Sequence, residues 1–178
     1  MAKKGSSSQS SMLSEEQHQK KRRREILFGS FMMLVGFLIL ISFLSYFYNW
    51  QTDQSTLEAF FDRNVQSQNI LNKLGALTAH FFIYQLFGFS AFIIPCLLGY
   101  TGLVLFFSLN KKRILRQWSW AMCYMTCLMV FLGFFKENSP ILSGLVGFEF
   151  NDFLVSYLGR TGLMSILVFT IIFILVVQ

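Results

Sequence analysis

Long segments without charged side chains constrain what this chain can fold into. Residues 26–48 contain no Asp, Glu, Lys or Arg, and residues 74–109 contain none over a longer stretch. A helix rises 1.5 Å per residue, so about 20 apolar residues cross the hydrocarbon core of a bilayer. A soluble domain of 178 residues could not bury a hydrophobic fraction of 54%, because much of a small domain's surface faces water. The sequence therefore predicts an all-α membrane protein.

We predict four transmembrane helices and two interfacial or re-entrant amphipathic helices on the outer side. The spans are expected at about 26–48, 90–109, 117–135 and 162–178, and the interfacial helices at about 74–87 and 147–158. Residues 74–109 are too long for one span and too short for two. A helix break is therefore expected at Gly88, and Gly159 and Gly162 are expected to break the last segment in the same way. The two halves are either a structural repeat or two apolar segments that share glycine breaks by chance.

The second interfacial helix carries a polar face. Glu149, Asp152 and Ser156 recur at i, i+3 and i+7, which places them on one side of a helix. Apolar residues occupy the opposite side, namely Phe150, Phe153, Leu154 and Tyr157. This pattern is typical of a helix that lies at the membrane interface. We interpret the polar residues as the wet outer face, and an ion site as the alternative.

Basic residues gather in two clusters, which predict the topology. Residues 1–25 are polar, and we expect a disordered cytoplasmic tail that precedes a membrane domain over 26–178. Eleven of the 15 Lys and Arg residues lie in this tail or in the loop after the second span. The positive-inside rule therefore places both termini in the cytoplasm. Contact with anionic lipid is predicted for these clusters, with DNA contact through the tail as a weaker alternative. The clusters are Lys20, Lys21, Arg22, Arg23 and Arg24, and Lys111, Lys112, Arg113 and Arg116.

The sequence offers no arrangement of side chains that is typical of catalysis, so no catalytic residue, cofactor or metal is predicted for this segment. Cys123 and Cys127 share a helical face at i, i+4. Nothing nearby completes a metal site, and packing is the favoured interpretation. His80 is interpreted as a hydrogen-bonded structural residue, with a proton relay as the alternative.

Several short motifs follow one another in an order that carries a resemblance. They are Lys73-Leu74-Gly75, Gln85-Leu86-Phe87-Gly88, Pro95, Gly99, Gly144, Gly147, Asp152-Phe153-Leu154, Tyr157-Leu158-Gly159 and Gly162. With the basic tail before the first span, this arrangement resembles the N-terminal four-span membrane domain of the FtsK/SpoIIIE family of bacterial DNA translocases. The resemblance covers roughly residues 20–178. Ser143-Gly144 stands where a doubled glycine is common in the family.

The resemblance implies a membrane anchor or scaffold of an FtsK-like DNA translocase. Such an anchor would place a cytoplasmic ATPase motor at the division septum of the bacterial inner membrane and couple cell division to chromosome segregation. The lipid bilayer, divisome membrane proteins and other copies of the chain, as a hexamer, would be its partners. ATP, Mg and DNA contact would belong to a motor beyond Gln178, because we expect the chain to be truncated before it, and this segment is not expected to be an enzyme. A small polytopic transporter or channel subunit is the alternative, and an intramembrane enzyme comes third.

Overall fold

The structure is a computed structural model, and it describes residues 4–57, 59–135 and 141–177, with side chains from residue 15 onward. The chain is 87% helical, and the described ranges contain no strand. Four helices are long and apolar enough to cross a membrane. The predicted all-α fold with four candidate spans is therefore confirmed.

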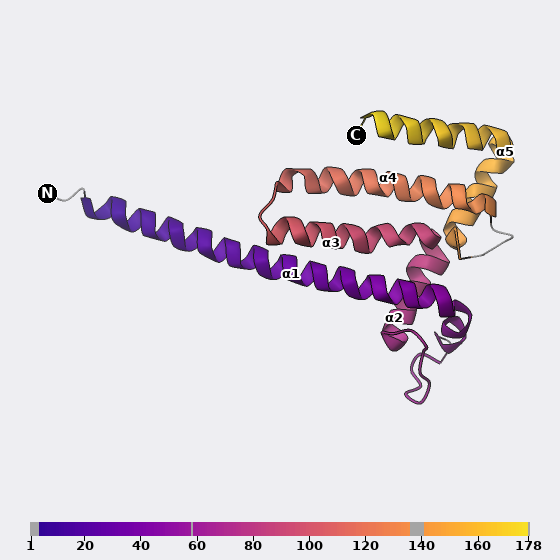
Figure 1. The fold of residues 1–178 in the computed structure, drawn as a ribbon, viewed down its shortest axis with the longest axis horizontal. Coiled ribbons are helices and arrows are strands. Elements are labelled where there is room, and N and C mark those ends of the chain that lie inside the picture. Colours follow the sequence, from indigo (N-terminus) through magenta and orange to yellow (C-terminus); the bar gives the residue numbers. More distant parts are fainter. Residues whose placement is uncertain (1–3, 58, 136–140, 178) are drawn as a thin grey trace.

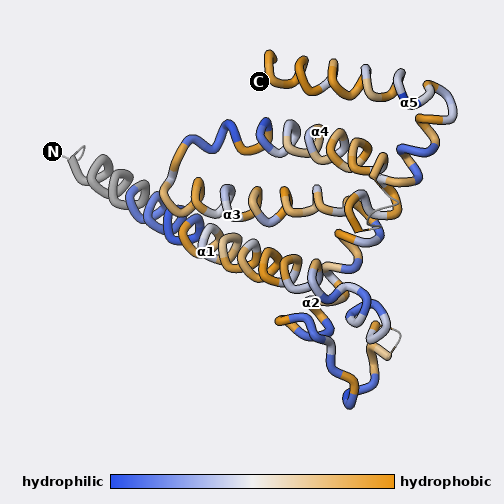
Figure 2. The backbone as a smooth tube through the Cα atoms, turned by 45° about the vertical axis from the view of Figure 1, so that its right-hand side comes forward, coloured by the Kyte–Doolittle hydropathy of each residue, from blue (hydrophilic) through white to orange (hydrophobic). Residues whose placement is uncertain are grey.

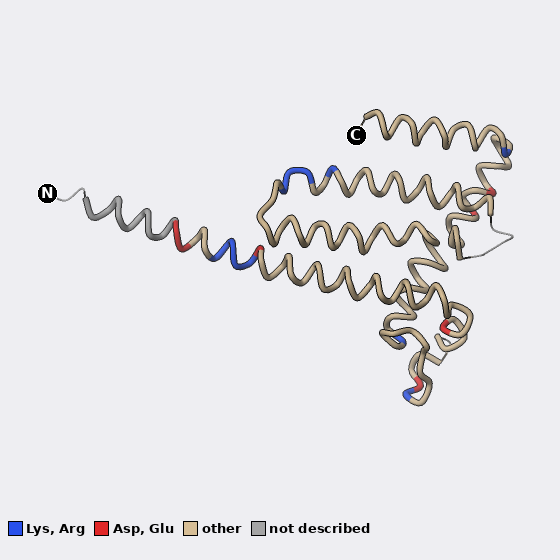
Figure 3. Tube along the Cα trace, in the orientation of Figure 1, with Lys and Arg blue, Asp and Glu red and all other residues tan. Residues whose placement is uncertain are grey.

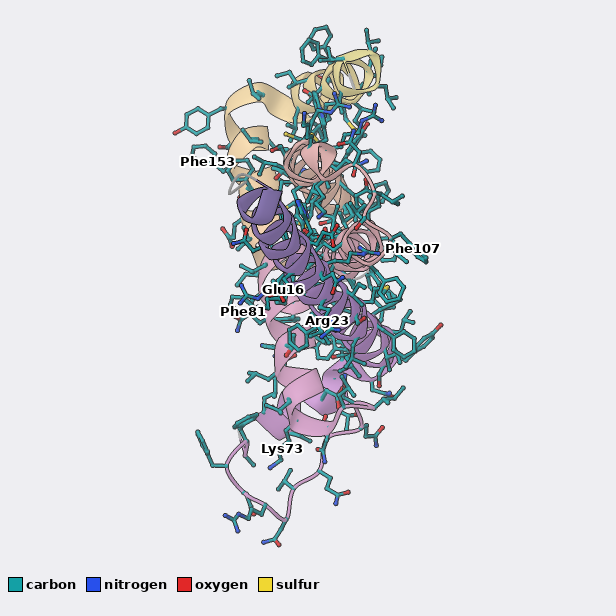
Figure 4. The ribbon with its side chains drawn as sticks, turned by 90° about the vertical axis from the view of Figure 1, so that its left-hand side faces the viewer. Glu16, Arg23, Lys73, Phe81, Phe107 and Phe153 are labelled. Carbon is teal, nitrogen blue, oxygen red and sulfur yellow. The ribbon has the colours of Figure 1, made fainter. Side chains whose placement is uncertain are left out.

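The four long helices lie side by side in one layer, in the order α1, α3, α4, α5 (Figure 1). Their bounds are α1 Lys4–Leu57, α3 Ile93–Phe106, α4 Ile114–Leu132 and α5 Gly144–Val177. Seen end on, the layer is thin (Figure 4). Only between 17% and 33% of the residues in the most apolar window of each span are buried inside the protein. Figure 2 shows that the spans are hydrophobic and that hydrophilic segments gather at their ends. Most of the apolar surface is therefore left for lipid or for other membrane helices.

Two helical segments run across the ends of the spans (Figure 1). The first is α2 (Asn72–Ala79), which continues as a π-helix, η1 (His80–Phe87), and then as a 3-10 turn, η2 (Gly88–Phe92), that leads into α3. The second is the part of α5 before Gly159, where the backbone leaves the helical conformation. Two further 3-10 turns flank α4, η3 (Lys111–Arg113) and η4 (Gly133–Phe135).

The breaks in these segments lie at glycines with positive φ, 59° at Gly88 and 70° at Gly159. Residues with a β-carbon rarely adopt such angles, so glycine is needed at both positions. The predicted breaks at Gly88 and Gly159 are therefore found. The break predicted at Gly162 is corrected, because Gly159 alone turns the chain and Gly162 lies inside the helix that follows.

The polar segment before the first span also differs from its prediction. The sequence predicts disorder over residues 1–25. Residues 1–3 lie outside the described part of the chain, and from Lys4 onward the segment is helical as part of α1. Residues 15–24 are mostly Glu, Gln, Lys and Arg, which have high helix propensity. They continue a helix that the apolar span has already nucleated, so they avoid the unfavourable first turn. Glu16 and Lys20 add an exposed ion pair at i, i+4, with 3.9 Å between Nζ and Oε2.

Glycines let α1 and α3 approach closely. A β-carbon built at Gly29 would lie 2.8 Å from the carbonyl oxygen of Gly102, and one built at Gly36 would lie 3.0 Å from that of Pro95. Small residues of this kind allow dispersion contacts between backbones in membranes, where lipid removes the hydrophobic drive for helix association. This seam explains why α1 and α3 form the most extensive helix pair of the structure.

A second close contact joins the two halves of the layer. The backbone N–H of Phe89 donates to the carbonyl oxygen of Leu142 across 2.8 Å. A β-carbon at Gly88 would lie 2.1 Å from that same oxygen, and one at Gly144 would lie 2.6 Å from the carbonyl oxygen of Leu86. Side chains larger than hydrogen therefore do not fit where η1–η2 crosses the start of α5.

We predict that Gly88→Ala lowers the free energy of unfolding by about 2–4 kcal/mol, because a β-carbon adds positive-φ strain to a clash with backbone. Gly99→Ala is the matched control, since a β-carbon there meets no heavy atom within 4 Å. Unfolding of both variants in detergent micelles, followed by circular dichroism, measures the difference. Equal stability of the two variants would contradict the crossing.

Candidate functional site

The charged residues divide the layer into two ends. Lys and Arg of residues 20–24 and 111–116 gather at one end, which also holds the end of α5 (Figure 3); we call it the basic end. The loop after α1 and the segments that run across the spans form the opposite end. Both predicted basic clusters therefore meet in space, although more than 80 residues separate Arg22 from its contacts near the second cluster.

Arg22 binds the C-terminal end of α3. Its Nη1 donates to the carbonyl oxygen of Leu105 across 3.2 Å, and its Nη2 donates to that of Phe106 across 2.7 Å. Nη1 also contacts Oγ of Ser108. The last carbonyls of a helix lack partners within the helix and carry partial negative charge. Arg22 therefore caps α3 and fixes the direction in which α1 leaves the layer.

Glu25 adds a second connection between the clusters. Its Oε1 lies 2.5 Å from Nζ of Lys111, and the hydrogen bond from this ammonium holds the pKa of Glu25 below its ordinary value of 4.5. Because the folded pKa is depressed, the stabilisation is present above pH 4.5 and is lost as the pH falls through the lowered pKa. We call the contacts of Arg22 and Glu25 the clamp. Glu25 was not among the predicted site residues; its only sequence signal is an acidic residue between a basic run and an apolar run.

The other basic residues are placed differently. Lys20 pairs with Glu16, and both side chains remain largely exposed. The remaining members are exposed and make no hydrogen bond or ion pair through their side chains within the described part of the chain. They are Lys21, Arg23, Arg24, Lys112, Arg113 and Arg116. The lipid contact predicted for these residues stays a prediction, and their exposure leaves them accessible for it.

At the opposite end, Asp53 organises the loop after α1. Its carboxylate is fully buried, and Oδ1 accepts from Oγ of Ser67 and from the backbone N–H groups of Gln68 and Asn69, the latter two across 2.9 and 3.1 Å. Asn69 in turn donates through Nδ2 to the carbonyl oxygen of Ser42 across 3.0 Å. The loop is therefore folded back onto α1 by hydrogen bonds rather than by apolar packing.

His80 and Lys73 complete this end. The hydroxyl of Tyr46 lies 2.8 Å from Nδ1 of His80, and the imidazole stacks on Tyr84 with 5.0 Å between ring centroids. His80 is thus a hydrogen-bonded residue at a helix contact, as the favoured interpretation has it. Nζ of Lys73 donates to carbonyl oxygens of the loop, including that of Phe60 across 3.0 Å.

The first part of α5 packs differently from its prediction. Glu149, Asp152 and Ser156 are exposed, as a wet face requires. Of the predicted apolar face, Phe150, Phe153 and Tyr157 are exposed as well, whereas Leu154 is half-buried and packs against buried residues of α4 and α5. Phe153 projects from the same side of the layer as Phe81 (Figure 4). The helix contacts α4 through a third face that the sequence did not reveal, where Asn151 is buried and its Nδ2 donates to the carbonyl oxygen of Val130 across 2.8 Å. An asparagine among polar residues gives no sign of burial from sequence.

A metal site at Cys123 and Cys127 would need further ligands. Among the described residues, no group of three His, Cys, Asp or Glu side chains lies close enough to hold a metal ion. Cys123 is exposed, and Cys127 lines an apolar cavity between helices. Polar side chains that are buried within the described part of the chain, such as Ser42, Asp53 and Asn151, lie toward the opposite end rather than midway along the spans.

A family model described as the 4TM region of DNA translocase FtsK/SpoIIIE matches residues 20–178. No curated protein and no solved structure matches the chain. The matched range begins at the first residue of the basic tail cluster and includes the clamp, the four candidate spans and both crossing segments.

For the clamp, we predict that Arg22→Gln speeds amide hydrogen exchange over residues 15–25 about tenfold, because charge-assisted hydrogen bonds contribute about 1.5–3 kcal/mol. Arg24→Gln removes the same charge from an exposed side chain and is the matched control. Hydrogen exchange followed by mass spectrometry in detergent micelles reads the difference. If both variants exchange at the rate of the parent chain, Arg22 does not hold α1 in place.

Proposed function

The chain belongs to the FtsK/SpoIIIE family as the four-transmembrane region of these DNA translocases, and we propose that it anchors a cytoplasmic ATPase motor at the division septum. In this role it would couple cell division to chromosome segregation. The observation that carries the proposal is the family match over residues 20–178. The chain is a multi-pass membrane protein, and this region is the membrane part of such translocases rather than their catalytic part.

The placement of the two ends supports the proposal. The end of α5 lies at the basic end, together with both Lys and Arg clusters (Figure 3). Basic residues favour the cytoplasmic side of a membrane. With that orientation in the bacterial inner membrane, both ends of the chain face the cytoplasm, and a motor joined after α5 would be held where chromosomal DNA lies. ATP, Mg and DNA contact belong to that motor.

The N-terminal part of α1 supplies a second element of the anchor. It continues beyond the layer at the basic end (Figure 1), and the clamp sets its direction. The exposed side chains of Lys21, Arg23 and Arg24 attract anionic headgroups, each by about 1 kcal/mol near the surface. The anchor would thus be seated at the cytoplasmic surface by charge as well as by its spans.

The flat layer suits lateral partners in the membrane. Large apolar side chains on α1 are exposed, Phe31 by 56% and Phe37 by 58%, and no helix of the described chain covers them. We propose that divisome membrane proteins and further copies of the chain, as a hexamer, use these faces. A transporter is disfavoured, since substrate sites of transporters place polar groups near the midplane. The cavities here are lined mostly by aromatic and aliphatic residues, and their polar residues Ser90 and Gln117 lie near the ends of the helices.

We predict that a fluorescent fusion of residues 1–178 concentrates at midcell in dividing bacteria. The septum contains two membranes, so the signal is divided by that of a lipophilic dye in the same cells. Enrichment beyond the dye supports the anchor proposal. A ratio that is uniform around the cell would contradict septal placement by this region.

A further inference from the structure

A groove separates α3 from α4. These helices make few contacts with each other compared with α1 and α3 or α4 and α5. The backbone crossing near Gly88 joins the halves at the opposite end, and a side-chain hydrogen bond from Trp118 to Thr101 joins them toward the basic end. Two cavities of about 480 and 630 Å³ lie along the groove and share the residues Ile93, Ala121, Tyr124 and Leu128. Cavities of this size are typical of small-molecule sites. The groove is therefore large enough to hold a ligand, and it is larger than the gaps that remain between packed side chains.

The groove extends from the basic end to the crossing. On α4, its lining runs from Gln117 near the basic end to Phe131, which corresponds to about 21 Å of helix. Along η2 and α3, the lining runs from Phe89, beside the crossing, to Tyr100. The hydrocarbon core is about 30 Å thick, and one leaflet takes about half of it. The part of the groove from Gln117 to Leu128 is therefore long enough to hold an acyl chain whose headgroup lies at the basic end.

Two arginines stand at the head of the groove. Arg113 and Arg116 precede the lining residues Gln117 and Trp120 by four positions, and residues four apart share a helix face. Side chains on a helix lean toward its N-terminus, which for α4 is the basic end. Both arginines are exposed and have no ion-pair or hydrogen-bond partner in the described chain. A guanidinium binds a phosphate through paired hydrogen bonds.

A polar group also lies unpaired at this end of the groove. Oε1 of Gln117 is buried without a hydrogen-bond partner in the described chain. A buried acceptor without a donor costs free energy, and a hydroxyl donor supplied by a headgroup would offset it. Nearby, Nε1 of Trp118 donates to Oγ1 of Thr101 across 3.0 Å and ties α4 to α3. This hydrogen bond holds α3 and α4 together at the basic end of the groove.

We propose that this groove binds one anionic phospholipid, with its phosphate on Arg113 and Arg116 and one acyl chain along Ala121, Tyr124 and Leu128. Charge complementarity decides the occupant: an apolar helix from a partner or a second copy would leave both arginines without a counter-charge. The proposal goes beyond membrane anchoring, because it assigns a single lipid to a defined position instead of a general affinity for the bilayer surface.

The test uses the full chain in nanodiscs of fixed phosphatidylglycerol and phosphatidylcholine content. Bromine, which quenches tryptophan, is placed on the acyl chains of either lipid in equal molar amounts. We expect the anionic lipid to be enriched about tenfold at Trp120, since each arginine near the surface attracts it, and thus to quench more. Trp120→Phe should remove the excess quenching, which assigns the signal to the groove.

The variant Arg113→Gln with Arg116→Gln should lose the excess quenching, and Arg23→Gln with Arg24→Gln, which removes the same charge from the tail, should keep it. Circular dichroism checks that each variant keeps its helix content. Equal quenching by the two lipids overturns the proposal, as does an excess that survives in the Arg113 and Arg116 variant. A Trp120 that neither lipid quenches would show that a helix of a partner or a second copy fills the groove.

Discussion

The backbone crossing at Gly88 and Gly144 sets the geometry on which the other features depend. There the N–H of Phe89 donates to the carbonyl oxygen of Leu142, and the space at both glycines admits no β-carbon. Since α3 and α4 touch little along their length, this contact holds the α1–α3 half and the α4–α5 half in one layer. The flat shape, the exposed apolar faces and the groove all follow from joining two helix pairs mainly at this crossing.

The two ends of the layer are stabilised by different chemistry. At the opposite end, the buried Asp53 accepts from backbone N–H groups of the loop after α1, which would otherwise be left unpaired near lipid. The buried Asn151 donates to a carbonyl oxygen near the end of α4. At the basic end, Arg22 and Glu25 tie charged residues of the tail to the end of α3 and its loop. Under the proposed anchor function, the first arrangement keeps the membrane part rigid, and the second transmits its orientation to the cytoplasmic side.

The separation in sequence between interacting residues decides which features of the fold could be predicted. The spans and the breaks at Gly88 and Gly159 are properties of local sequence, because an uncharged stretch of residues 74–109 cannot be one span. Local sequence could not choose Gly159 over Gly162, since both flank the same turn. Local sequence also led to a prediction of disorder in the tail, where high helix propensity and the adjacent, already nucleated span extend α1. The contacts of Arg22 with α3 and of Asn151 with α4 join residues far apart in sequence, so no pattern within one segment could reveal them.

Cysteine accessibility in cells measures the central claim, a four-span layer whose basic end faces the cytoplasm. In a chain without native cysteines, Gln66→Cys and Ser156→Cys place thiols at the opposite end, and Leu109→Cys places one at the basic end; all three positions are exposed. A membrane-impermeant maleimide should label Gln66→Cys and Ser156→Cys in intact cells, and Leu109→Cys only after the cells are permeabilised. Labelling of Leu109→Cys in intact cells, or protection of Gln66→Cys, would contradict the account.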